Sequence, residues 1–154
     1  MIKWYQDKEI KIFFSIIPNV KARFLTPYCN KNEIKEYKEK PFINLEKLDV
    51  ELFDCKKNKK YFFEIKKDYT WDGASIPRMF WRLIGSKTEP EFLIPSLVHD
   101  VLCENHNYID NDRYFSTKVF EKLLKISKVN PFKRWLMFHS IDNYQKFKRW
   151  KNEL

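Results

Sequence analysis

Two short runs of residues hold the side chains that could do chemistry. The first, segment 69–78, contains Asp72, and the second is His99 followed directly by Asp100. An imidazole can transfer protons, and carboxylates with backbone carbonyls are the oxygen ligands that calcium and magnesium prefer. The sequence therefore locates one candidate site, in which His99 would transfer protons while Asp72 and Asp100 hold a divalent cation.

The loop around Asp72 is predicted to have a shaped backbone. Gly73, one of only two glycines in the chain, permits a positive φ between Asp72 and Ser75. Asp72 could instead bond its own backbone in the turn, and that alternative stays open. Ser75 lacks the G-x-S-x-G surroundings of a nucleophilic serine. The supporting residues of this loop are Trp71, Gly73, Ser75 and Arg78.

His99 falls within an amphipathic helix predicted over residues 89–107. Its apolar stripe comprises Leu93, Ile94, Leu97, Val98, Val101 and Leu102. The other face carries small polar and titratable residues, namely Ser96, His99, Asp100, Cys103 and His106. For a single His-Asp pair, ordinary surface or second-layer polar residues are the interpretation with more weight.

Asp112 lies in the first turn of the next predicted helix and precedes Phe115 and Val119 by three and seven residues, on the core side. A buried carboxylate needs a partner. Asp112 therefore either complements the dipole at the helix N-terminus or orients His99, as a group behind a general base does.

The elements that must position these residues are strands first and helices afterwards. Strands are predicted at 10–17 and 20–25, and a hairpin pairs 48–54 with 61–65. Residues 30–41 read as a solvated connection or a short exposed helix.

Four helices are predicted, over residues 78–84, 89–107, 110–127 and 131–150, with Asp110 or Asn111 capping the third. This order predicts an α+β fold, with a small N-terminal antiparallel sheet packed against a C-terminal bundle of about four helices. The 154 residues suit a single domain, with strands mainly in 10–67, a loop at 68–77 and helices in 78–150.

The net charge of +9, from 30 basic and 21 acidic residues, favours anionic partners, and nucleic acid stays open among them. General solvation is the preferred explanation of this charge. The last helix mixes basic residues with Trp135, Phe138, Tyr144, Phe147 and Trp150. That mixture suits a membrane interface or nucleic acid, but a core helix with snorkelling lysines is preferred.

Three cysteines, Cys29, Cys55 and Cys103, form no CxxC pair, which disfavours a disulfide framework and suits a reducing cytoplasm. The apolar run 10–17 is interrupted by Lys11 and is too short to span a bilayer. We therefore expect a cytoplasmic protein without a transmembrane segment.

The chain resembles a family of phage and prophage proteins known as domain of unknown function 1353. The resemblance covers roughly residues 42–145 and rests on the run from Trp71 to Arg78, on His99-Asp100 with Cys103, and on Asp112 with Phe115. The family usually has an aromatic residue, often Tyr, where this chain has Cys103. The resemblance implies a phage or host protein as partner and a location in the host cytoplasm or the virion. It implies no established activity.

A second resemblance is to calcium-dependent secreted phospholipases of the A-two class. It implies that His99 is the general base for water, that Asp100 binds calcium and that Asp112 orients His99. The Asp72-Gly73 loop would take the place of their calcium loop. This chain departs from that class because it lacks the disulfides and the glycine-rich loop, and because Cys103 replaces the usual Tyr.

Three functions follow from these observations. The first is a small metal-assisted hydrolase of acyl esters or lipids, with calcium as the expected cation. The second is a phage accessory protein in which the same residues form a structural polar network. The third is a module that binds anionic partners through its last helix.

Overall fold

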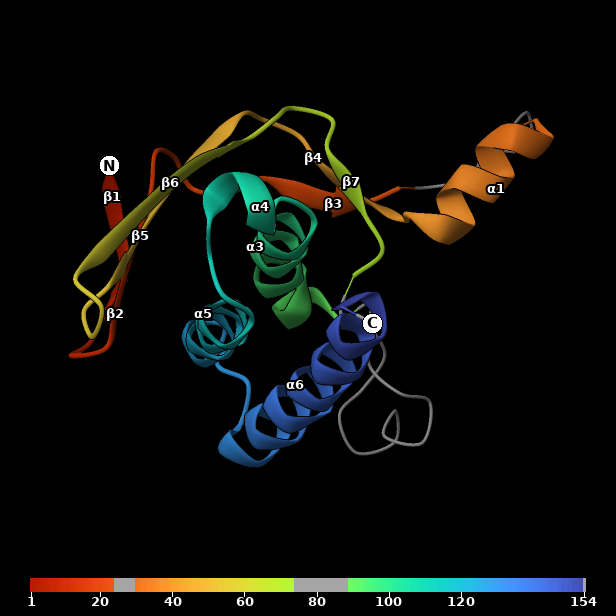
Figure 1. The fold of residues 1–154 in the computed structure, drawn as a ribbon. Helices are drawn as coiled ribbons and strands as arrows, with labels where there is room; N and C mark the ends of the chain where they lie inside the picture. Colours follow the sequence, from red (N-terminus) through yellow and green to blue (C-terminus); the bar gives the residue numbers. More distant parts are fainter. Residues whose placement is uncertain (24–29, 74–88, 154) are drawn as a thin grey trace. The chain divides into compact units, whose positions relative to one another are not determined.

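The computed structural model describes residues 1–23, 30–73 and 89–153, with side chains up to residue 143. Two compact units make up the chain, Met1–Gly73 and Ala74–Leu154 (Figure 1). All described strands belong to the first unit, and the four α-helices described in the second unit lie between residues 93 and 153. The predicted α+β class is therefore confirmed, whereas a single domain and packing of the helices on the sheet stay predictions.

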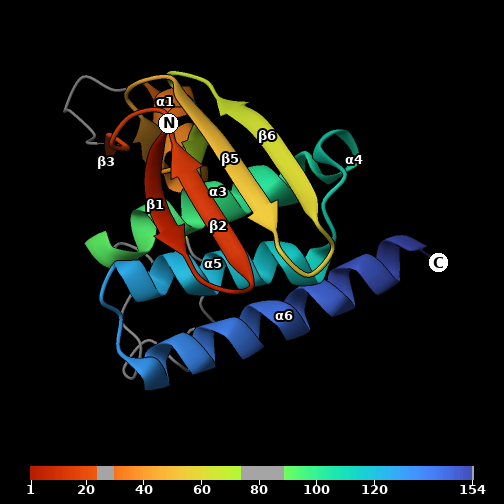
Figure 2. The same ribbon diagram turned by 90° about the vertical axis from the view of Figure 1, so that its left-hand side faces the viewer.

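The larger sheet of the first unit is antiparallel, in the order β1-β2-β5-β6 (Figure 2). Its strands are β1 (Ile2–Gln6), β2 (Ile10–Phe14), β5 (Leu48–Asp54) and β6 (Lys59–Ile65). Val50 of β5 lies opposite Phe14 on one side and Phe63 on the other, and all three side chains are buried. Residues at alternate positions face the same side of a sheet, so the predicted hairpin and its period of two are confirmed.

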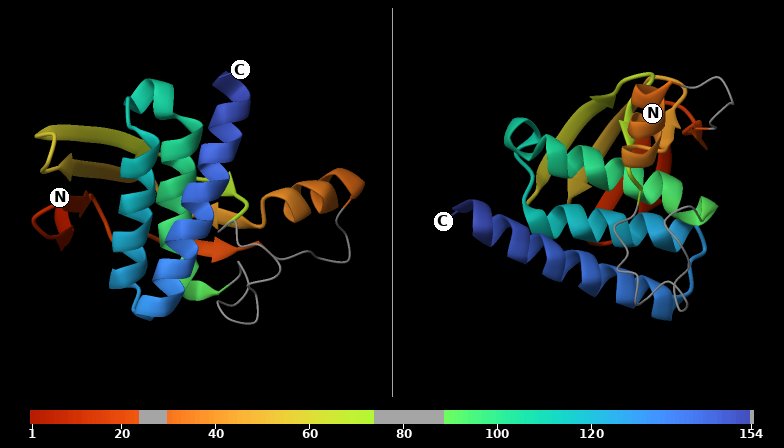
Figure 3. Two further views of the ribbon diagram at one scale, coloured as in Figure 1. Left: turned by 60° about the horizontal axis from the view of Figure 1, so that its bottom comes forward. Right: turned by 90° about the vertical axis from the view of Figure 1, so that its right-hand side faces the viewer.

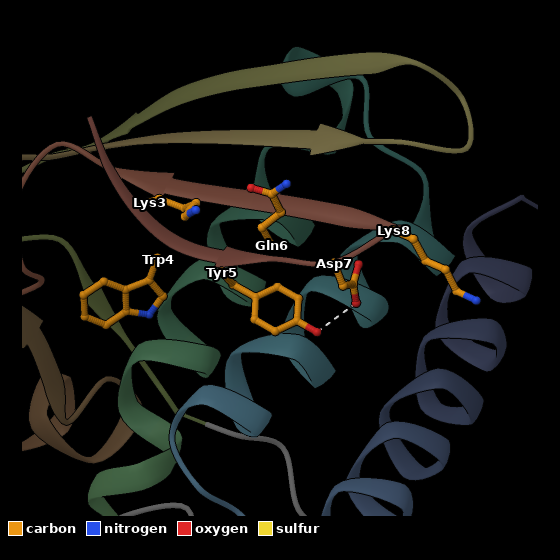
Figure 4. A pocket seen from close by; sticks show the side chains of 6 residues that line it. All are labelled: Lys3, Trp4, Tyr5, Gln6, Asp7 and Lys8. Carbon is orange, nitrogen blue, oxygen red and sulfur yellow. Dashed lines mark hydrogen bonds between the residues drawn. The ribbon is translucent and has the colours of Figure 1, made fainter.

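Strand β1 forms the edge of this sheet and carries a bulge. Its register with β2 shifts between Lys3 and Tyr5, where Trp4 is the additional residue. A bulge re-aims the side chains around it, and Trp4 and Tyr5 project to the same side of the strand (Figure 4). The Trp4 ring lies 5.2 Å from that of Phe14.

A second sheet, in the order β3-β4-β7, ends at the predicted loop. Its strands are β3 (Val20–Ala22), β4 (Phe42–Asn44) and β7 (Thr70–Trp71). Between β3 and β4 lies α1 (Lys31–Glu39), which has a capping box between Asn30 and Glu33 and buries none of its residues. The exposed-helix alternative for residues 30–41 is therefore the correct one.

The described part of the second unit, residues 89–153, consists of a short 3-10 helix and four α-helices. These are η2 (Pro90–Phe92), α3 (Leu93–Glu104), α4 (His106–Ile109), α5 (Arg113–Ile126) and α6 (Pro131–Glu153). Helices α3, α5 and α6 lie side by side with α5 in the middle, and successive helices run in opposite directions (Figures 2 and 3). One core cluster comprises Phe92, Phe120, Leu124, Val129, Met137 and Ile141.

Two predicted helix boundaries are wrong. The helix predicted over 89–107 is interrupted at Asn105, after which α4 forms a single turn. The cap of α5 is Asp112, not Asp110 or Asn111. Asp110 instead ends α4 with a φ of 61°, a left-handed conformation that Asp tolerates better than most residues.

Helix α6 contributes Met137 and Ile141 to the core, yet Trp135 is 57% exposed. The preferred core interpretation is thus confirmed for the helix but wrong for this aromatic residue. In the described ranges, none of the helices combines the length and the apolar character that crossing a bilayer requires.

Candidate functional site

Helix α3 places Cys103 one turn after His99, so both side chains project from the same face. The Cys103 Sγ atom lies 3.7 Å from His99 Nε2 and 4.0 Å from Nδ1. The imidazole is 7% exposed and packs at 5.1 Å against the ring of Phe120 on α5. A thiol and an imidazole at this separation can exchange a proton.

The polar face expected on α3 is only partly solvated, because two of its five residues are buried. Ser96 is 1% exposed, and its hydroxyl donates to the carbonyl of Leu93 at 3.0 Å. His99 is covered because α5 packs along this side and brings Phe120 onto the imidazole. Of the expected face, Asp100, Cys103 and His106 are only half-buried.

The residues proposed to hold a cation lie in different units. Asp72 is exposed and follows β7 in the first unit, whereas Asp100 is half-buried on α3 in the second. Gly73 has a φ of 90°, which confirms the shaped backbone expected beside Asp72. Trp71 is buried and packs at 5.7 Å against the ring of Phe42. Ser75 and Arg78, like the helix predicted over 78–84, lie outside the described residues.

Metal-binding side chains do not gather in the described part of the chain: no group of three or more His, Cys, Asp or Glu that could hold an ion occurs there. Asp72 and Asp100 offer the hard oxygen atoms that calcium prefers. The fit to calcium therefore rests on the type of donor, and its geometry stays a prediction.

Asp112 caps α5. Its Oδ1 atom accepts from the backbone N–H of Phe115 at 2.6 Å, while its backbone is extended. The buried neighbour Asn111 donates from Nδ2 to the Asp112 carbonyl at 3.4 Å. The interpretation that places Asp112 at the helix N-terminus is thus supported, and its role in orienting His99 stays a prediction.

His106 lies at the start of α4, immediately after the helix that carries Cys103. Its Nδ1 atom is 3.2 Å from the carbonyl oxygen of Cys103. A protonated Nδ1 donates to that carbonyl, so His106 helps to close the C-terminal end of α3. This contact agrees with a supporting role.

Sequence reasoning missed the ion pair between Arg113 and Asp142. The Arg113 Nη1 atom is paired with a carboxylate oxygen of Asp142 and also lies 3.3 Å from the Asp142 carbonyl. A signal was present, because a cation in the first turn of a helix opposes the helix dipole and needs compensation.

The structure also describes a groove along β1, with a volume of about 650 Å³ (Figure 4). It is lined by Lys3, Trp4, Tyr5, Gln6, Asp7 and Lys8. The Tyr5 hydroxyl donates to Asp7 Oδ2 at 2.8 Å, and Asp7 Oδ1 accepts from the backbone of Glu9 and Ile10. These bonds hold the turn after β1 in shape. The Asp7 carboxylate thus has hydrogen-bond donors from the protein itself, and its position does not require a bound ligand.

Comparison with known proteins gives a family but no activity. A curated relative, "Uncharacterized protein y4jT" from Sinorhizobium fredii, is 32% identical over 73 residues. The aligned part takes in 47% of this chain and 21% of that relative, so the chain spans about a fifth of the relative's length. No solved structure matches. The model of the family described as "Protein of unknown function (DUF1353)" matches residues 48–141, and the chain belongs to this family.

Proposed function

We propose that this protein is a small hydrolase of acyl esters or lipids, in which His99 is the general base and the Cys103 sulfur is the nucleophile. The supporting observation is the distance of 3.7 Å between Cys103 Sγ and His99 Nε2. A nucleophile within hydrogen-bonding reach of a base that a third group holds in place is the usual arrangement for covalent catalysis. Here Phe120 packs against the base.

The reaction would proceed in two balanced steps. His99 takes the thiol proton, the thiolate attacks the acyl carbonyl, and the C–O bond breaks as the leaving alcohol takes the proton back from His99. In the second step His99 removes a proton from water, the hydroxide attacks the thioester, and the C–S bond breaks. The acid leaves and the thiol is regenerated.

Orientation of His99 by Asp112 belongs to the same proposal. The cap of α5 uses Oδ1 of Asp112, so orienting the imidazole would fall to Oδ2. Calcium bound by Asp100 and Asp72 would polarise the substrate carbonyl. No step above depends on the ion.

The experiment compares hydrolysis of an activated ester, p-nitrophenyl acetate, by the wild type and by His99→Gln, Cys103→Ser and Cys103→Ala. We expect each substitution to reduce kcat/KM by on the order of 10²-fold or more. Cys55→Ser and His139→Gln are matched controls, because Cys55 is half-buried in the β5–β6 turn and His139 is exposed on α6.

Each other outcome has a definite meaning. If Cys103→Ala is active and His99→Gln is inactive, the nucleophile is a water molecule activated by His99 and not the Cys103 thiol. Full activity of a folded His99→Gln variant would exclude the proposed function.

A second candidate function is a non-enzymatic phage or prophage accessory protein in the host cytoplasm or the virion. The burial of His99 and the use of Asp112 as a helix cap support the part of this proposal in which these residues form a structural polar network. In that case His99→Gln lowers the melting temperature, and neither the wild type nor any variant hydrolyses esters above the rate in buffer.

A further inference from the structure

A second surface of the helical unit carries exposed aromatic side chains. Phe132 and Trp135 on α6 are each 57% exposed, and Tyr114 on α5 is 51% exposed. Large apolar side chains that form one exposed patch mark an interaction surface, whereas single exposed apolar residues are normal. Together with Phe138 and His139, we call these residues the aromatic strip.

Ring contacts join the members of the strip across two helices. The Trp135 ring lies 4.7 Å from His139, and His139 lies 5.3 Å from Phe138. Phe138 then meets Tyr114 edge to face, with centroids 6.3 Å apart. Phe132 precedes Trp135 by three residues, so both project from one side of α6. The contact between Tyr114 and Phe138 carries the strip from α6 to α5, and these two helices are neighbours (Figure 3).

Positive charge accompanies these rings. The Lys118 ammonium lies 5.8 Å from the Tyr114 ring centroid and 5.7 Å from that of Phe138. Lys133 directly follows Phe132 in the sequence. The whole chain carries a net charge of +9. The surface is thus both apolar and cationic, which complements an anionic partner.

The ring contacts distinguish between the two anionic partners that suit such a surface. Single-stranded nucleic acid binds by stacking bases on open ring faces. In the strip, Lys118 lies over Tyr114 and Phe138, and His139 packs against Trp135. A bilayer interface instead accepts the edges of Trp, Tyr and Phe at headgroup level, with lysines beside the phosphates.

We propose that the aromatic strip binds the surface of an anionic lipid bilayer. Phe132, Trp135 and Tyr114 enter the boundary between headgroups and acyl chains, while Lys118 and Lys133 remain at the level of the phosphates. Helix α6 would lie along the membrane rather than cross it. This binding is separate from the proposed hydrolase activity and does not depend on it.

The test is sedimentation of the full chain with sucrose-loaded vesicles, made of phosphatidylcholine alone or with about 30% phosphatidylglycerol to supply anionic headgroups. We expect binding to the anionic vesicles that weakens as salt is raised. Phe132→Ser and Trp135→Ser should each lower the partition coefficient by about tenfold, because each removes a ring from the apolar boundary. Melting curves check that both variants are folded.

Phe62→Ser is the matched control. Phe62 lies on β6, outside the strip, and is 59% exposed, so it loses the same ring from a site of nearly equal exposure. The proposal requires that this variant bind vesicles as the wild type does.

Absence of binding to anionic vesicles at low salt would overturn the proposal, and so would an equal loss in Phe62→Ser. Binding to a single-stranded oligonucleotide but not to vesicles, with a loss in Trp135→Ser, would assign the strip to nucleic acid instead. Hydrolysis of a water-soluble ester by the same variants tells this failure apart from failure of the proposed function, since the strip takes no part in that reaction.

Discussion

The guanidinium of Arg113, at the start of α5, is ion-paired with the buried carboxylate of Asp142 on α6. The same guanidinium also contacts the Asp142 backbone carbonyl at 3.3 Å. These contacts join two neighbouring helices at the end where α5 begins. The Asp142 carboxylate also compensates the positive charge of Arg113, which opposes the helix dipole in the first turn of α5.

Asp142→Ala should destabilise the protein by about 3–5 kcal/mol, because it leaves the Arg113 guanidinium partly buried without this carboxylate. Urea unfolding followed by circular dichroism measures the change. Glu36→Ala is the control, since its ion pair with Arg23 is more exposed and should contribute about 1 kcal/mol or less. Equal effects of the two substitutions would contradict the structural importance of Asp142.

Substitutions of Asp112 separate its cap from its proposed role in catalysis. Asp112→Ala should lower the free energy of unfolding by about 0.5–2 kcal/mol, whereas Asn caps as well as Asp does. If Asp112 also orients His99, Asp112→Asn should keep the stability and reduce ester hydrolysis by on the order of 10⁴-fold. A stable Asp112→Asn variant with full activity would leave the residue with its capping role alone.

Gly73→Ala should destabilise the first unit by about 1–2 kcal/mol, because a Cβ atom crowds the backbone at positive φ. The comparison is Asp68→Gly, at a φ of 69°, which relieves the same kind of crowding and should change stability by less than about 1 kcal/mol. Thermal melting of both variants gives the answer. A neutral Gly73→Ala would mean that the turn beside Asp72 relaxes at no cost.

Calcium should raise the melting temperature if Asp100 and Asp72 hold it. At about one hundred times its dissociation constant a ligand adds about 2.7 kcal/mol, which for a domain of this size corresponds to about 5 to 10 °C. Melting in EDTA and then with calcium, magnesium or zinc measures the shift, and Asp100→Asn should abolish it. Identical melting curves under all four conditions would remove the cation from the proposal.

The strands that could be predicted are those with long alternating patterns. Residues 48–65 show such a pattern because every second side chain is buried along β5 and along its partner β6. Strands β4 and β7 have three and two residues, too short for a period, and β7 exists through pairing such as that of Trp71 with Phe42. Strand β1 was missed because its bulge breaks the alternation at Trp4.

The site was only partly predictable, because contacts within one helix follow from sequence spacing whereas contacts between helices do not. The spacing of His99 and Cys103 gives their contact on α3 directly, since residues four apart meet on a helix. Burial of His99 depends on Phe120, which the sequence alone does not assign to that side of α3. Exposure of Trp135 depends likewise on which face of α6 packs on α5, and Met137 and Ile141 occupy that face.

The segment shared with the family begins at Leu48, the first residue of β5, while β5 is paired on its other side by β2. A fragment that started there would lack β2, and the backbone N–H and C=O groups along one whole side of β5 would be open to another chain. Unprotected strand edges are templates for aggregation. In this chain β2 pairs along that side of β5, and the edge of the sheet lies at β1, whose bulge interrupts the regular row of backbone groups that another strand could pair with.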